Sequence, residues 1–122
     1  MKNISIHNLN ESTSQEVFDF ITKHLRTQNK PCVGTSGECL YRHENLMCAA
    51  GCLIPVEVYK LEFEGKSWQA IGGHFGCWKH EGLIRSLQVV HDNQRADCWE
   101  GHFEKIAGEY GLEMPAKVET FK

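Results

Sequence analysis

The sequence has no long hydrophobic run. No stretch approaches the roughly 20 apolar residues of a membrane span, so no membrane-spanning segment is expected. Residues 1–10 are polar and lack the apolar core of a secretion signal. Without export, thiols stay reduced, and we expect free cysteines in a cytoplasmic protein. The six cysteines concerned are Cys32, Cys39, Cys48, Cys52, Cys77 and Cys98.

A cluster of lysine and arginine is also missing. The chain has 13 basic and 16 acidic residues, and up to Lys60 the two signs are balanced at six each. Tight binding to a phosphate backbone depends on a basic footprint. We therefore expect no direct DNA binding, although a small local site for phosphate groups stays open.

Repeats, low-complexity tracts and long linkers are absent as well, and 122 residues correspond to one domain, 1–122. The first predicted element is a helix over 15–27. Thr13, followed three residues later by Glu16, forms a capping-box pattern at its start, and apolar residues recur at helical spacing behind it. Residues 28–37 are rich in small polar residues, glycine and proline, which predicts a loop.

The middle of the chain predicts a short hairpin. Two apolar and aromatic stretches, 39–42 and 46–50, flank a polar centre, although the alanines weaken the second strand. Residues 51–55 predict a turn or a single helical turn. The glycine-rich segment 65–82 predicts an irregular loop held in place by its aromatic side chains.

Two helices close the chain. Leu83, Leu87 and Val90 form one apolar stripe. The last helix is predicted to have Asp97 as its cap and Gly111 as its left-handed stop. Its apolar face comprises Trp99, Phe103, Ile106, Ala107 and Tyr110. The predicted fold class is α+β, a small single domain of about three main helices packed with a short antiparallel hairpin.

Several segments resemble one protein family. They are Cys39-Leu40-Tyr41-Arg42, the run from Cys48 to Pro55, Tyr59 to Gly65, Leu87-Gln88 before His91-Asp92, and Trp99-Glu100. Together they span most of the chain, which is similar to a family of small phage- and prophage-encoded proteins. The resemblance implies a phage origin and the host cell cytoplasm, and it implies no particular reaction.

Histidine and cysteine spacings leave a metal site or thiol chemistry open. Zinc could take ligands from pairs or triplets at short spacing, namely Cys48/Cys52, Cys98/His102 and His74/Cys77/His80. Two tight CxxC pairs are missing, and free cysteine is often a buried small hydrophobe, so buried cysteines are the favoured interpretation. A thiol enzyme would use Cys39 or Cys48 with His91 and Asp92, although adjacent side chains are not expected to face each other.

Ligand recognition is the third possibility. An arginine beside an aromatic ring, as at Tyr41 and Arg42, can pair with phosphate or carboxylate while the ring stacks on a base. The alternative is that Arg42 pairs with an acidic side chain and Tyr41 fills the core. Trp68, Trp78 and Phe75 could form a stacking pocket or fold their loop over the core.

The predicted ligand-binding residues are therefore Tyr41, Arg42, Trp68, Trp78, His91 and Asp92. The favoured function is a phage-encoded accessory binding protein that neutralises a host defence, by sequestering an anionic nucleotide signal. A direct inhibitor of a host protein is the second hypothesis, and a zinc-stabilised module or thiol-dependent enzyme is the third. The sequence leaves the oligomeric state open.

Overall fold

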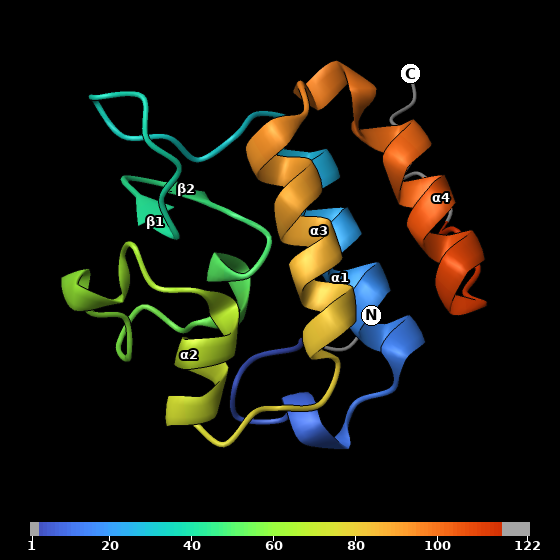
Figure 1. The fold of residues 1–122 in the computed structure, drawn as a ribbon, viewed down its shortest axis with the longest axis horizontal. Coiled ribbons are helices and arrows are strands. Elements are labelled where there is room, and N and C mark those ends of the chain that lie inside the picture. Colours follow the sequence, from blue (N-terminus) through green and yellow to red (C-terminus); the bar gives the residue numbers. More distant parts are fainter. Residues whose placement is uncertain (1–2, 116–122) are drawn as a thin grey trace.

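The computed structural model describes residues 3–115 and confirms the α+β fold class (Figure 1). Within this range the four α-helices are α1 Ser14–Gln28, α2 Trp68–His74, α3 Glu81–Asn93 and α4 Trp99–Tyr110. The two strands are β1 Arg42–His43 and β2 Leu46–Met47. Short 3-10 helices are η1 Leu9–Glu11, η2 Gly51–Leu53, η3 Leu61–Phe63 and η4 Ala96–Cys98. None of the helices in the described part is long and apolar enough to cross a membrane.

Helix α1 begins with the predicted capping box. The Thr13 hydroxyl accepts the Glu16 N–H, and the Glu16 carboxylate accepts the Thr13 N–H. Asn29 ends the helix in the left-handed conformation. Local signals therefore define both ends of this helix.

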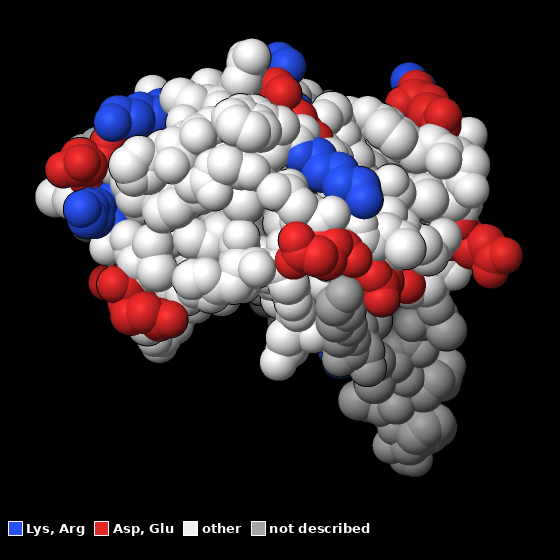
Figure 2. Space-filling model, turned by 90° about the horizontal axis from the view of Figure 1, so that it is seen from below, with Lys and Arg blue, Asp and Glu red and all other residues white. Residues whose placement is uncertain are grey.

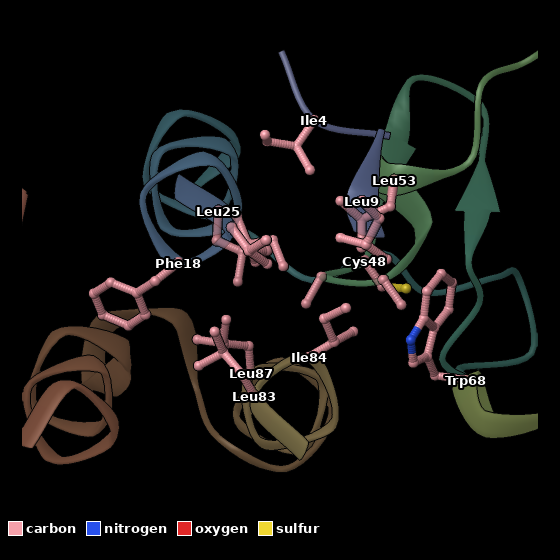
Figure 3. Close-up of a cluster of buried hydrophobic side chains, with 14 of the residues drawn as sticks. Ile4, Leu9, Phe18, Leu25, Cys48, Leu53, Trp68, Leu83, Ile84 and Leu87 are labelled. Atoms are coloured by element: carbon pink, nitrogen blue, oxygen red, sulfur yellow. The ribbon is translucent and has the colours of Figure 1, made fainter. Parts of the chain in front are cut away.

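Helix α3 lies at the centre and contacts each of the other three α-helices (Figure 1). Its buried face comprises Leu83, Ile84, Leu87, Val90 and His91. This face meets the buried face of α1, while Phe18 extends from α1 towards α4 (Figure 3). Cys48 and Trp68 lie at the other edge of the same cluster (Figure 3).

The predicted hairpin is present but shorter than expected. Arg42 pairs with Met47 and His43 with Leu46, and Glu44 in the turn has a positive φ of 57°. The hairpin lies beside α2 and α3 at one edge of the molecule (Figure 1).

The glycine-rich segment 65–82 is not wholly irregular, because α2 forms inside it. Ser67 caps this helix by accepting the Ala70 N–H at 3.2 Å. Gly72 allows the chain to fold back closely: a Cβ there would lie 2.6 Å from the Cys77 carbonyl oxygen. A high glycine content thus serves close packing here rather than loop flexibility.

The last helix also differs from the prediction at its start. Asp97 does not cap α4, because it lies in η4 and its carboxylate pairs with Arg95 at 2.7 Å. Gly111 ends the helix with φ 67°, as expected. Phe103 is fully buried, whereas Tyr110 is 41% exposed, so the apolar face is buried along only part of its length.

Candidate functional site

A pocket of about 410 Å³ lies beside the outer face of α3, and we call it the α3 pocket. It is formed by residues 39–41 before β1, Cys48 after β2, residues 64–68 at the start of α2, and α3 itself. These segments lie next to one another on one side of α3 (Figure 1). Its lining residues are Cys39, Leu40, Tyr41, Cys48, Glu64, Gly65, Lys66, Ser67, Trp68, Arg85, Gln88, Val89 and Asp92.

Hydrogen bonds from Tyr41 join residues 39–41 to residues 64–68. Its hydroxyl donates to the Lys66 carbonyl oxygen, and its backbone N–H donates to Glu64 Oε1 at 2.9 Å. Glu64 Oε2 accepts the Arg42 N–H and the Tyr59 hydroxyl. Both oxygens of the Glu64 carboxylate are therefore engaged by the protein.

The α3 side of the pocket consists of Arg85, Gln88, Val89 and Asp92. Their spacing of three, four and seven residues places them on one helical face. The buried stripe of Leu83, Leu87 and Val90 lies on the other side of the helix, so core packing leaves this polar face towards the pocket.

A chain of hydrogen bonds holds Asp92 in place. The Cys32 N–H donates to His91 Nε2 at 2.8 Å, and His91 Nδ1 donates to Asp92 Oδ1 at 2.8 Å. Gln88 Nε2 donates to the same oxygen at 2.7 Å, while Gln88 Oε1 accepts the Ala50 N–H. The expectation that His91 and Asp92 would not face each other is therefore wrong.

The same contacts argue against thiol catalysis. Because Nε2 of His91 accepts an N–H, the proton of the neutral ring is on Nδ1 and points at Asp92. Neither ring nitrogen is free to take a proton from a thiol. Burial, followed by the nearby Asp92 carboxylate, raises the pKa of the Cys39 thiol, which lowers the fraction of reactive thiolate.

Metal binding by His91 is also opposed by the hydrogen bonds on both of its ring nitrogens. Among the described residues, one group places three ligand atoms within 4.8 Å of one another: Cys39, His91 and Asp92. A metal on His91 would have to replace either the Cys32 N–H or the Asp92 contact. The zinc sets considered from sequence do not assemble into such a group, and all six cysteines are free thiols.

The cations of the pocket are less engaged than its carboxylates. Lys66 is exposed and forms no ion pair with a described residue. Arg85 Nη1 lies 3.7 Å from Glu81 Oε2, an i,i+4 surface pair that contributes about 0.3–0.5 kcal/mol at most. Charges on the face shown in Figure 2 occur in small mixed groups rather than as a continuous basic tract.

The structure brings three of the six predicted site residues to the pocket: Tyr41, Trp68 and Asp92. His91 is buried behind Asp92 and supports it. The two others, Arg42 and Trp78, are absent from the lining, and Trp78 is 66% exposed on the surface.

The guanidinium of Arg42 does not form the acidic side-chain pair considered from sequence. Its Nη2 donates to the Ile54 carbonyl oxygen at 3.0 Å, and it pairs with no acidic side chain of the described residues. Its Nε is buried without a hydrogen-bond partner. Tyr41, by contrast, is buried as one alternative expected, with 8% exposure.

Sequence reasoning missed Lys66, Arg85 and Gln88. Helical periodicity could have identified the last two, because they share a face with Asp92 opposite the apolar stripe. No local pattern marks Lys66, since only the fold of segment 64–68 brings it to the pocket.

Comparison with known proteins finds no matching family, no matching curated protein and no matching solved structure.

Proposed function

We propose that this chain is a binding protein that holds a small anionic ligand of the nucleotide class in the α3 pocket and does not transform it. The observation that carries the proposal is the difference between its cations and its carboxylates. Lys66 forms no ion pair with a described residue and Arg85 forms only the 3.7 Å surface pair with Glu81, whereas Glu64 and Asp92 already accept hydrogen bonds from the protein. A phosphate that reached both cations would form charge-assisted hydrogen bonds.

The dimensions and wall of the pocket support a ligand of this kind. A volume of about 410 Å³ falls in the range of about 300–1,000 Å³ that small-molecule sites occupy. Tyr41, Trp68, Leu40 and Val89 contribute apolar surface next to the charged groups. The locked His91 ring and the raised pKa of Cys39 favour binding over thiol catalysis.

A role in infection follows from the phage resemblance, within the same proposal. The segments that carry the resemblance contribute Cys39, Tyr41, Cys48, Gln88 and Asp92 to the pocket, although they are far apart in the sequence. In this role the protein is a phage-encoded accessory protein that neutralises a host defence in the host cytoplasm by sequestering an anionic nucleotide signal.

Direct binding to a host protein is the second candidate. It is supported by exposed apolar side chains, of which Leu61 is 80% and Val56 69% exposed. Both lie on the segment between η2 and α2, and contiguous exposed apolar surface is a feature of interaction sites. This candidate needs no small ligand, so a set of nucleotides that leaves Tm unchanged would favour it over nucleotide binding.

The test is a thermal melt of the full chain with nucleoside monophosphates and the matching nucleosides. A bound monophosphate at a hundred times its Kd stabilises the fold by about 2.7 kcal/mol, which raises Tm. We expect the nucleosides, which lack the phosphate, to raise Tm much less. A wild type whose Tm no monophosphate changes would contradict the proposal and favour protein binding.

Charge variants assign the binding to the pocket. We expect Lys66→Gln and Arg85→Gln each to weaken monophosphate binding roughly tenfold in calorimetric titration, because each removes a charge-assisted contact. Arg95→Gln is the matched control, since Arg95 is 83% exposed and lies outside the pocket lining. Equal affinities of all three variants and wild type would show that the ligand binds elsewhere.

A further inference from the structure

The α3 side of the pocket has a positive charge at one end and a negative charge at the other. Arg85 lies towards the start of the polar helical face and Asp92 at its end. Seven residues at 1.5 Å each separate the two Cα atoms by about 10 Å along the helix axis. A ligand that contacts both side chains therefore needs an anionic group for Arg85 and a separate group that suits a carboxylate for Asp92.

Asp92 is the pocket carboxylate with an oxygen left for a ligand. Both Glu64 oxygens accept hydrogen bonds within the protein. Asp92 accepts the His91 and Gln88 donors on Oδ1, so neither of them occupies Oδ2, and the Cys39 thiol beside the carboxylate is a weak donor. The Asp92 side chain is 33% exposed, so this oxygen belongs to a group that solvent reaches.

The contacts behind Asp92 hold its carboxylate in one orientation. His91 is completely buried and fixed by the Cys32 N–H, and Gln88 is fixed by the Ala50 N–H. An acceptor held in this way loses little side-chain entropy when a ligand donates to it. The arrangement suits recognition of an N–H group and repels a carbonyl oxygen.

We infer that Asp92 Oδ2 accepts a hydrogen bond from the exocyclic amino group of a nucleotide base while Lys66 and Arg85 hold the phosphate. This inference rests on the proposed function and specifies its ligand class as amino-bearing nucleotides. An oxo group at the same position would place two acceptors against each other, so amino and oxo forms of one base differ in affinity. One hydrogen bond to a charged group corresponds to roughly a ten- to hundredfold difference.

Two matched ligand pairs test the inference by calorimetric titration of the full chain. AMP and IMP differ by an amino or an oxo group on the purine, as do CMP and UMP on the pyrimidine. We expect wild type to bind AMP more tightly than IMP, CMP more tightly than UMP, or both, by at least tenfold. The phosphate-dependent rise in Tm should be common to whichever bases bind.

Asp92→Asn reverses the chemistry at this position. The amide oxygen of Asn can keep the His91 and Gln88 donors, which leaves its NH₂ group facing the ligand as a donor. We expect this variant to lose affinity for the amino form at least tenfold and to bind the oxo form better than wild type does. Asp97→Asn is the matched control, because Asp97 is exposed and lies outside the pocket lining.

The outcomes separate the two levels of the proposal. Monophosphates that bind without amino preference, and with unchanged affinities in Asp92→Asn, would overturn the role of Asp92 and leave the proposed function standing. Absence of monophosphate binding in wild type would overturn both. A melt of each variant without ligand checks its fold, and a destabilised Asp92→Asn leaves the amino preference of wild type as the deciding measurement.

Discussion

Gly51→Ala tests the packing that positions Tyr41 in the α3 pocket. A Cβ at Gly51 would lie 2.0 Å from the Tyr41 carbonyl oxygen, whereas real Cβ contacts essentially never fall below 3.0 Å. Residues 41 and 51 must therefore move apart by about 1 Å. The obstructing atom is backbone and cannot rotate away. It also accepts the Cys48 N–H at 3.1 Å, so the shift strains that hydrogen bond.

The expected effect is large. Overpacking typically destabilises by about 1–3 kcal/mol, and a clash with fixed backbone belongs at or above the upper end of that range. For a chain of this size, about 3 kcal/mol lowers Tm by roughly 10 °C. The assay is urea and thermal unfolding followed by far-UV circular dichroism, with monophosphate binding measured on the folded variant.

Gly101→Ala is the matched control for this prediction. The same substitution in α4 meets no atom within 4 Å, so it should stabilise the helix by up to about 1 kcal/mol. The same glycine-to-alanine substitution is therefore expected to lower Tm at position 51 and to raise it at position 101. A Gly51→Ala variant that melts within about 2 °C of wild type would refute the close contact between η2 and Tyr41.

Three further predictions concern the core, pH and thiol reactivity. Phe103→Ala should lower the free energy of unfolding by about 3–5 kcal/mol in urea titrations, because the ring is fully buried, and a loss below about 1 kcal/mol would contradict that burial. Burial lowers the pKa of His24 below 6.5, so the unfolded chain takes up this proton more readily and stability falls as pH drops below about 6.5. His24→Gln can keep the contact with the Met47 carbonyl oxygen, and unfolding at about pH 7 and pH 5.5 should show a smaller pH dependence than wild type; an unchanged dependence would exclude His24 as a source. Cys39 should react with iodoacetamide more slowly than a free thiol at about pH 7.5, because its pKa is raised, and rapid labelling of Cys39 by mass spectrometry would contradict this.

Local signals account for the elements that sequence reasoning predicted correctly. The capping box at Thr13 and Glu16 and the left-handed stop at Gly111 act within a few residues, so the sequence around them suffices. Apolar spacing identified α3 and α4 because a buried helical face repeats every three to four residues. The hairpin was recognised from its polar turn, but the length of its strands depends on tertiary contacts.

The errors occur where distant contacts compete with local ones. Glycines at 72, 73 and 76 indicated a loop, yet close approach of Cys77 to Gly72 makes a glycine useful inside α2. An aspartate is a common helix cap, but the Asp97 carboxylate forms an ion pair with Arg95 instead. His91 and Asp92 face each other because the Cys32 N–H fixes the histidine ring from behind.

The sequence by itself determined the α+β class, the main helices and the buried stripe of α3, because these follow from short-range spacing and burial. Only the tertiary structure decided which polar side chains share a pocket. Tyr41 and Lys66 meet through a hydrogen bond across 25 positions. Asp92 is oriented by donors from Gln88 and from His91, whose ring is fixed by the Cys32 N–H across 59 positions. Such contacts depend on how segments far apart in the chain pack together, and no local pattern encodes them.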